Sequence, residues 1–464
     1  MVFSSLTFLF LFLPFSLMAH YISRNNFFRN LSLTIFSLIF YAWGEPMWIF
    51  LLLFTSFFDY AAGLLIGGLR GKTSSLVVLW LSVLVNLSLL VFFKYGGFIW
   101  DNLSYFLTLP FSRPQNSLPI GISFYTFQTI SYLVDVYRGE VKAQKNPVYF
   151  LLFVSLFHQL VAGPIVRYKT IAEEIEGRQV NWEMISAGVS RFCLGLFKKV
   201  IIANTAYELV HKYLEAGFSE LSGPEAWFGI TMFSVQIYFD FSGYSDMAIG
   251  LGRLFGFHYE ENFRHPYAAQ SVGDFYRRWH ISLGKFFRDY VYIPLGGNRQ
   301  NQLRNILIVW LLTGAWHGAS WNFVLWGAYF GFFMVLEKLL ENYLPFIPRI
   351  LRHAYTLFLI IFSRAIFYFV DFGRLKIFCY KLFRGSPEPG PGFFTDLYEY
   401  SFWMVLVVCM CIPWDEIFPE NSRFLLRLKP VYRYSAPLLN LIFLLSAAIM
   451  LVDSTYNPFI YFRF

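Results

Sequence analysis

The chain has 464 residues, of which 57% are hydrophobic, 22% are aromatic and only 14% are charged. Soluble domains carry about 25% charged residues, so this composition excludes an ordinary soluble protein and indicates a membrane protein with many spans. The net charge of +8 is typical of basic cytoplasmic loops that meet anionic lipid headgroups. We therefore expect membrane lipids, and no nucleic acid, as partners of the charged surface.

Apolar segments that could form membrane helices recur along the whole chain. A bilayer core of about 30 Å needs about 20 apolar residues, and several candidates are shorter or more polar than that. We therefore predict an all-α polytopic integral membrane protein with about 10–12 transmembrane helices plus re-entrant and interfacial helices. The candidate segments are 5–22, 30–44, 47–67, 76–97, 101–111, 119–136, 148–163, 184–209, 225–255, 303–318, 321–341, 353–372, 398–413 and 435–453.

The first apolar segment resembles a signal peptide, but its first cation, Arg24, follows the apolar run instead of preceding it. We expect a retained first span with its amino terminus outside. The positive-inside rule then places the basic loops near Arg70, at 138–145 and at 258–304 in the cytoplasm. We interpret residues 1–464 as one membrane domain. Its predicted parts are amino-terminal helices (1–118), a core with the candidate site (119–341), and carboxy-terminal helices with a tail (342–464).

The four cysteines lie in apolar runs and show no CxxC spacing. This pattern favours neither a disulfide framework nor a zinc site, so we predict no metal centre.

The segment 236–252 places two carboxylates in a candidate span. Asp240 and Asp246 lie there among further polar side chains, and charged groups at membrane depth cost about 2.5–3.5 kcal/mol each on insertion scales. The segment is explained either by a paired polar network that locks helices together or by the wall of a solvated tunnel. Gly243 and Gly250 would let neighbouring helices approach closely in either case.

The segment 257–305 has more cations than acids. From Ser271 to Tyr292 only two glycines interrupt the helical pattern, and Ser271 with Asp274 forms a capping pair, so we predict one helix with His280 near the seam between its polar and apolar faces. Its charges suit a phosphate-bearing donor or an acidic carrier protein, or simply a surface helix whose cations reach the lipid headgroups. The donor-side candidates are Arg277, Arg278, Lys285, Lys198 and Lys199.

His317 is the only Asp, Glu, Lys, Arg or His residue of the apolar stretch 311–331. Gly314 and Gly318 flank it, and these small residues either leave room for a substrate or allow tight helix packing. Histidine has a pKa near physiological pH, as a general base requires.

These segments, in this order, resemble the bacterial membrane-bound O-acyltransferase family. The likeness covers nearly the whole chain and is nearest to the membrane subunits of alginate O-acetylation and related systems, with the D-alanyl transferases of teichoic acid more distant. The stretches that carry it are "YFDFSGYSDMAIGLGRLFG", "NFRHPYAAQSVGDFYRRWHISLGKFFRDYVYIPLGG", "LLTGAWHGASWNFVLWG", "PIGISFYTFQTISYLVDVYRG" and "FVSLFHQLVAGPIVRYKT".

The resemblance implies a ring of helices around a funnel, in which a cytoplasmic thioester meets an acceptor from the other side of a bacterial inner membrane. It implies that His317 is the catalytic histidine and that His280, 37 positions earlier, is its companion. It further implies no bound cofactor, acetyl-CoA or another acyl thioester as donor substrate, a cell-surface polysaccharide as acceptor, and an extracytoplasmic SGNH-type acetyltransferase as partner.

Acyl transfer to a hydroxyl needs a base and a hydrogen-bond donor for the carbonyl oxygen. We assign the base to His317 and leave the donor open among His280, Trp316, Trp321 and Asn322, while Asp240 and Asp246 could orient an imidazole. Tyr461, in the terminal "FIYFRF", is either a transient acyl carrier or an aromatic anchor at the interface. The rival function is a transporter or flippase, which predicts inverted repeats that the sequence does not show.

Overall fold

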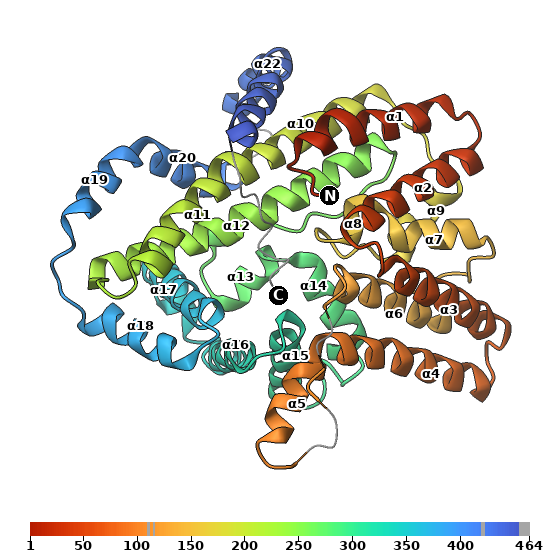
Figure 1. Ribbon diagram of the computed structural model, residues 1–464, viewed down its shortest axis with the longest axis horizontal. Coiled ribbons are helices and arrows are strands. Elements are labelled where there is room, and N and C mark those ends of the chain that lie inside the picture. Colours follow the sequence, from red (N-terminus) through yellow and green to blue (C-terminus); the bar gives the residue numbers. More distant parts are fainter. Residues whose placement is uncertain (109–111, 115–116, 419–422, 454–464) are drawn as a thin grey trace. The chain divides into compact units, whose positions relative to one another are not determined.

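The computed structural model describes residues 1–108, 112–114, 117–418 and 423–453. Within these ranges the chain is mostly helical, and the only β-type pairing is an isolated bridge between Phe263 and Trp279. The predicted all-α class is confirmed (Figure 1). The chain divides into two compact units: Met1–Phe192 with Ser245–Glu261 and Arg288–Tyr290, and Cys193–Tyr244 with Asn262–Phe287 and Val291–Phe464. The division of the membrane domain into three parts at residues 118 and 341 stays a prediction.

The first unit is built from the amino-terminal helices. They are η1 (Phe8–Phe12), α1 (Leu13–Ile22), α2 (Asn26–Gly44), α3 (Ile49–Gly68), α4 (Thr73–Leu90), η2 (Val91–Tyr95), α5 (Gly96–Ser104), α6 (Ile122–Arg138), α7 (Pro147–Ser155), α8 (Phe157–Leu160), α9 (Tyr168–Glu176) and most of α10 (Trp182–Phe197).

The second unit holds most of the remaining helices. They are η3 (Lys198–Ala203), α11 (Asn204–Val210), η4 (His211–Ala216), α12 (Gly223–Leu254, whose last turns belong to the first unit), η5 (Pro266–Ala268), α13 (Val272–Arg278), α14 (Ile281–Phe287), η6 (Arg288–Tyr292, which begins in the first unit), α15 (Gln302–His317), α16 (Trp321–Leu339), η7 (Leu344–Phe346), α17 (Arg349–Tyr368), α18 (Phe372–Arg384), α19 (Pro391–Glu399), α20 (Ser401–Cys411), α21 (Trp414–Ile417) and α22 (Arg423–Asp453).

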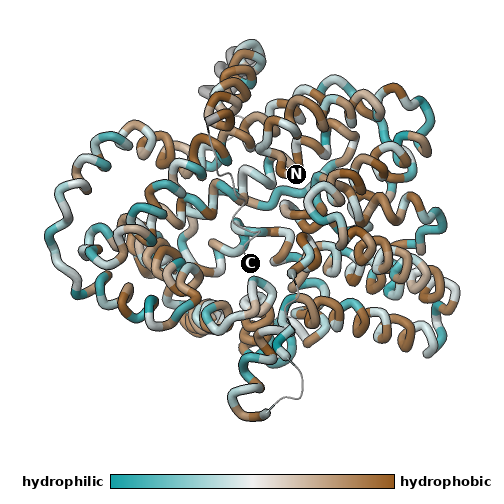
Figure 2. Tube along the Cα trace, in the orientation of Figure 1, coloured by the Kyte–Doolittle hydropathy of each residue, from teal (hydrophilic) through white to brown (hydrophobic). Residues whose placement is uncertain are grey.

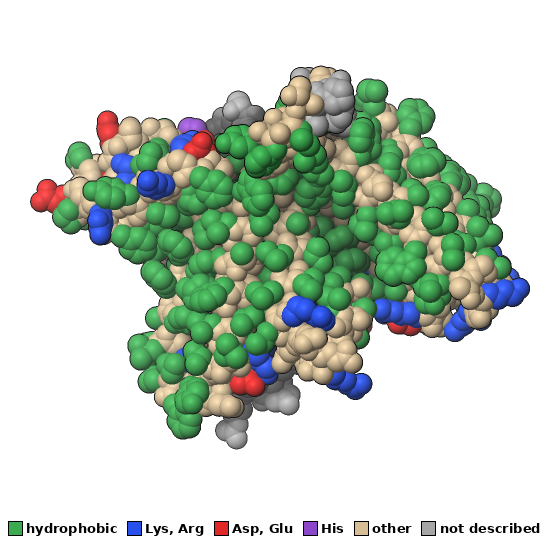
Figure 3. Space-filling model, turned by 90° about the horizontal axis from the view of Figure 1, so that it is seen from below, with side chains coloured by type: hydrophobic (Ala, Val, Ile, Leu, Met, Phe, Trp, Pro, Cys, Tyr) green, Lys and Arg blue, Asp and Glu red, His purple; other side chains and the backbone are tan. Residues whose placement is uncertain are grey.

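Four of the described helices are long and apolar enough to cross a membrane. They are α3, the continuous helix at Thr73–Ser104, α17, and the Tyr434–Val452 part of α22; α19 and α20, bent by 62°, could form a fifth span. Brown, hydrophobic tube marks α3, α4 and α17 in Figure 2, and hydrophobic side chains cover most of the face drawn in Figure 3. The count of about 10–12 crossings stays a prediction, because the other helices are shorter, broken or more polar than this criterion allows.

Glycines bring α10 and α12 into close contact. A Cβ atom on Gly250 would lie 2.7 Å from the carbonyl oxygen of Gly188, and one on Gly243 would lie 2.7 Å from that of Gly195. Such distances leave no room for a side chain, so the backbones touch directly. We predicted that Gly243 and Gly250 allow a close approach of neighbouring helices, and this prediction is confirmed.

A second close contact joins α15 to α16, which lie side by side in Figure 1. A Cβ atom on Gly327 would lie 2.5 Å from the carbonyl oxygen of Trp310, and one on Gly314 would lie 3.0 Å from the Cα of Gly327. The ring of Phe323 fills the space at Gly318. Of the two explanations for the small residues around His317, helix packing accounts for Gly314 and Gly318.

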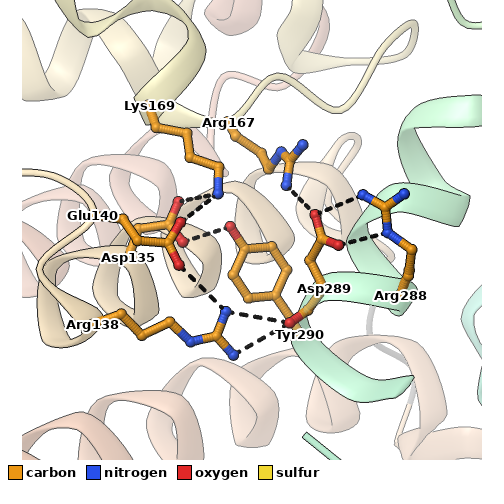
Figure 4. A network of polar contacts seen from close by, with 8 residues as sticks. All are labelled: Asp135, Arg138, Glu140, Arg167, Lys169, Arg288, Asp289 and Tyr290. Atoms are coloured by element: carbon orange, nitrogen blue, oxygen red, sulfur yellow. Dashed lines mark hydrogen bonds and ion pairs between the residues drawn. The ribbon is translucent and has the colours of Figure 1, made fainter. Parts of the chain in front are cut away.

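An ion-pair network holds the short segment Arg288–Tyr290 within the first unit (Figure 4). Asp289 accepts a hydrogen bond from Arg167 at 2.7 Å, and the Tyr290 hydroxyl donates to Asp135 at 2.8 Å. Although burial raises the pKa of Asp289, hydrogen bonds from Arg288 and Arg167 outweigh it and leave the pKa below its usual value. The carboxylate therefore stays charged and fastens the segment that directly follows α14.

We predict that Gly327→Leu separates α15 from α16. The new side chain would meet the Trp310 carbonyl, and overpacking of this kind costs about 1–3 kcal/mol of unfolding free energy. Thermal unfolding of the purified protein in detergent would show a lower midpoint. Gly68→Leu is the control, because a Cβ atom there meets nothing within 4 Å; equal midpoints for both variants would contradict the packing argument.

Candidate active site

His317 lies at the last residue of α15 and is 5% exposed. Its ring contacts three aromatic rings edge-on, with centroid distances of 5.0 Å to Trp316, 5.0 Å to Trp326 and 5.4 Å to Phe367. Gly318 follows in an extended conformation and ends the helix. The close packing of α15 on α16 therefore fixes the imidazole in an aromatic cage at the end of a helix.

His280 lies in a break between two short helices, so the prediction of one continuous helix from Ser271 to Tyr292 is wrong. Helix α13 ends at Arg278, and α14 begins at Ile281 after His280 has adopted a φ of 46°, in the left-handed region. Sequence pattern did not reveal the break because no glycine or proline marks it. The predicted cap is confirmed, since the Ser271 hydroxyl accepts a hydrogen bond from the Asp274 amide at 2.9 Å.

The break is held by backbone pairing with the segment that precedes η5. The Ile281 amide donates to the Asn262 carbonyl at 3.0 Å, and the Arg264 amide donates to the Arg278 carbonyl at 2.9 Å. These bonds satisfy backbone groups that an interrupted helix would otherwise leave without partners. A non-glycine residue in the left-handed region costs about 1–3 kcal/mol and persists only where its surroundings impose it.

The side chain of Asn262 determines which nitrogen of His280 carries hydrogen. Asn262 Oδ1 accepts from the Ser282 amide at 3.2 Å and lies 3.1 Å from His280 Nδ1. Because the backbone amide can only donate, this atom is an oxygen acceptor, and Nδ1 must supply the hydrogen. Neutral His280 therefore keeps a lone pair on Nε2, a buried atom for which the described residues provide no hydrogen-bond partner.

His280 is buried outside the candidate membrane spans, and its burial lowers the pKa to about 3. The ring is therefore neutral at physiological pH, and a group with so low a pKa is a weak base. Since Nε2 presents a lone pair and no hydrogen, neutral His280 cannot be the donor that stabilises a negative oxygen. Its geometry suits a hydrogen-bond acceptor that orients a hydroxyl group.

One cavity of about 180 Å³ joins the two histidines. Both His280 and His317 line it, and the Trp316 ring contacts both imidazoles at 5.8 and 5.0 Å. The other lining residues are Tyr276, Trp279, Leu283, Gly284, Phe287, Val309, Trp310, Thr313, Trp326 and Met334.

Trp326 is a site residue that sequence reasoning missed. It lines the cavity, contacts the His317 ring, and carries a buried indole N–H with no acceptor among the described residues. The signal that could have found it is its place in "ASWNFVLWG", nine positions after His317. A buried N–H without an acceptor is costly, so a substrate oxygen is a natural partner for it.

Two of the predicted oxyanion donors do not fit that role. Asn322 is buried, but its amide already donates to the carbonyls of Ile366 and Phe367 at 3.2 and 3.1 Å. Trp321 is 53% exposed and is not among the residues that line the cavity. Trp316 is likewise not among the lining residues, but it remains a candidate because it is buried and its ring contacts both histidines.

The two carboxylates of α12 are paired with cations. Asp240 lies 2.8 Å from Lys199 Nζ, and both side chains are almost completely buried. Asp246 lies 2.7 Å from Arg191, which also reaches Glu261. These contacts favour the interpretation as a locking network, while the role of either carboxylate in orienting an imidazole stays a prediction.

The predicted donor-side cations separate into two groups. Arg277 has a side chain that is 74% exposed, and its one ion pair among the described residues is a long contact of 3.9 Å with Asp274. Arg278 is paired with Asp274 and Glu416. Lys199, paired with Asp240, is buried and does not face outward. Lys285 is partly buried on α14, and Lys198 is partly buried at the start of η3. Tyr461 lies outside the described residues, so its role stays a prediction.

A protein-family model described as the membrane-bound O-acyltransferase family matches residues 140–370. The probable alginate O-acetylase of Pseudomonas aeruginosa is 42% identical over 377 residues, which cover 79% of this chain and 72% of that protein. This chain belongs to the membrane-bound O-acyltransferase family. It is therefore a multi-pass membrane protein with O-acyltransferase activity, and the transporter alternative is set aside.

Two further relatives of this O-acyltransferase are named for acceptors other than alginate. The peptidoglycan O-acetyltransferase of Helicobacter pylori is 37% identical over 376 residues, covering 73% of this chain and 70% of that protein. The teichoic acid D-alanyltransferase of Bacillus subtilis is 27% identical over 314 residues, covering 62% and 74%. The resemblance stated from sequence motifs is thus confirmed.

We predict that Lys199→Met destabilises the protein by about 3–5 kcal/mol, because it leaves the buried Asp240 carboxylate without its cation. The double variant Lys199→Met/Asp240→Leu should recover much of this loss, since an apolar pair removes both buried charges. The control is Arg113→Met, which breaks an exposed pair with Asp101 and should leave stability almost unchanged, because solvent screens that pair. Equal effects in both single variants, measured by chemical unfolding, would contradict the network interpretation.

Proposed function

We propose that this protein transfers an acetyl group from a cytoplasmic thioester of the acetyl-CoA class to an extracytoplasmic acceptor, for O-acetylation of an alginate-type cell-surface polysaccharide. Support comes from the 42% identity to the alginate O-acetylase over 79% of the chain. The proposal includes a bacterial inner-membrane location and an SGNH-type partner that completes the transfer. Transfer of D-alanine is the second candidate, supported by the more distant teichoic acid relative.

The observation that carries the chemistry is the cavity shared by His317 and His280. In the proposed step, His317 takes the proton of the acceptor hydroxyl while the hydroxyl oxygen bonds to the thioester carbonyl carbon. The carbonyl oxygen becomes negative in the tetrahedral intermediate. The carbon–sulfur bond then breaks, and the thiolate recovers the proton from His317, so atoms and charge balance.

The other cavity residues have complementary roles in this proposal. The Nε2 lone pair of His280 accepts a hydrogen bond from a second hydroxyl of the polysaccharide acceptor and so orients it, because the single hydrogen of the reacting hydroxyl goes to His317 and a ring with a pKa of about 3 does not take it. The indole N–H of Trp326 donates to the developing oxyanion. Exposed Arg277 is the cation best placed to meet the phosphates of a donor.

We predict that His317→Ala and His317→Gln abolish O-acetylation while the protein remains abundant in membranes. Loss of a positioned base lowers turnover by about 10²–10⁴-fold. The measurement is the acetyl ester and D-alanyl ester content of cell-envelope material from cells that carry each variant. His211→Gln is the control, because that histidine is exposed in η4. Retained acylation in the His317 variants would exclude the proposed base, and loss of D-alanyl ester alone would replace the acetyl proposal with the second candidate.

We predict that Trp326→Phe lowers kcat by about 10²–10³-fold, the effect of removing one oxyanion donor, with little change in KM. Phenylalanine retains an aromatic ring against His317 and Phe330 but removes the N–H group. Trp227→Phe is the matched control, because its N–H donates to the Leu382 carbonyl and not to substrate. A kcat that falls equally in both variants would show that Trp326 acts through stability alone.

A further inference from the structure

A second and larger cavity lies within the same unit as the histidine site but shares no lining residue with it. Its volume is about 610 Å³, within the range of about 300–1,000 Å³ that is typical of small-molecule sites. Helices α12, α17 and α20 and the short helix η5 form most of its walls. The lining residues are Thr231, Ser234, Val235, Tyr267, Ala268, Gln270, Arg349, Ile350, His353, Leu357, Ile361, Val407, Val408, Cys411, Ile412 and Pro413.

The shape of this crevice follows one face of α17. Arg349, His353, Leu357 and Ile361 are spaced by four residues, so they lie on one helix face over 12 residues, or about 18 Å at 1.5 Å per residue. That length slightly exceeds half of the roughly 30 Å hydrocarbon core, which is the depth of one lipid leaflet. Helix α17 is a candidate membrane span, and α20 belongs to the bent pair that could form another.

The long part of the crevice presents an apolar surface. Its three hydroxyl groups all donate within the protein: Thr231 to the Trp227 carbonyl, Ser234 to the Ile230 carbonyl, and Tyr267 to the Ser234 carbonyl, at 2.7, 3.0 and 2.5 Å. No hydroxyl hydrogen is therefore left for a polar ligand. The remaining wall at this depth is made of aliphatic side chains, which suit a hydrocarbon chain.

One end of the crevice is cationic. Arg349 is exposed at the first residue of α17, and it makes no hydrogen bond or ion pair with any residue that the structure describes. Asp274, which accepts the Gln270 amide near this end, is itself paired with Arg278. Arg349 thus keeps its charge available to an anion, with His353 one turn deeper, where its Nδ1 donates to the Ala269 carbonyl.

We propose that this crevice binds an anionic phospholipid, with one acyl chain between α12, α17 and α20 and the phosphate beside Arg349. An apolar groove one leaflet deep, with an unpaired cation at its end, matches the two chemically different parts of such a lipid. This inference does not depend on the acyl group that the enzyme transfers. It assigns to the fold a lipid site separate from the cavity of His280 and His317.

The test uses the full-length protein in nanodiscs made of phosphatidylcholine and phosphatidylglycerol. Either lipid carries a photoreactive diazirine in its acyl chain, and mass spectrometry locates the labelled residues after illumination. We expect phosphatidylglycerol to label Leu357, Ile361 and Val407. Its labelling should exceed that of phosphatidylcholine about fivefold, the ratio that corresponds to about 1 kcal/mol for one cation beside an anionic headgroup.

Two variants separate the parts of the site. Arg349→Gln should remove the fivefold preference without removing the label, whereas Arg384→Gln, at an exposed position on α18 outside the crevice, should leave it unchanged. Leu357→Trp should fill the crevice and displace the label, whereas Leu351→Trp, at an exposed position outside it, should not.

The wild-type map decides the question even if a variant fails to fold. No label in the crevice would overturn the proposal, because another group would then occupy the space. Equal labelling by the two lipids would also overturn it, because that is the behaviour of the lipid annulus around any membrane protein.

Discussion

The constraint on which this structure depends is that few polar groups lie inside a largely apolar chain, and each must be compensated there. Lys199 is buried beside Asp240, and Arg191 joins Asp246 to Glu261. Removing one partner of such a pair leaves an uncompensated charge, which costs far more than losing an exposed pair. The paired charges of α12 thus hold neighbouring segments in place, whereas His280 and His317 line the cavity of the candidate site.

The two histidines reach that cavity by different physical means. His317 is held at the end of α15 by backbone contact with α16 and by three aromatic rings. His280 is held by a strained backbone conformation and by Asn262, which also sets its tautomer. In the proposed mechanism one ring takes a proton and the other accepts a hydrogen bond. Their different surroundings therefore make two identical side chains chemically unequal, a general way to divide roles within an active site.

The crevice proposed to bind lipid shows the same compensation of polar groups. Its hydroxyl groups are satisfied internally, so the groove is apolar despite containing Thr231, Ser234 and Tyr267. Only its end, at Arg349, offers a free charge. In both cavities, the groups that a ligand can contact depend more on which polar groups are already hydrogen-bonded or ion-paired within the protein than on which residue types line the cavity.

The amino-acid sequence by itself determined the helical membrane class, the family and the capping of α13 by Ser271, and it singled out His280 and His317 as candidate site residues. These follow from composition, helical periodicity and motifs, which are local properties of the chain. Only the tertiary structure decided that the segment 271–292 breaks at His280, that Asp240 pairs with Lys199, that the donors of Asn322 are already used, and that Trp326 faces His317. Each of these depends on a partner far away in the sequence, and no local pattern specifies which distant groups will satisfy a buried polar atom.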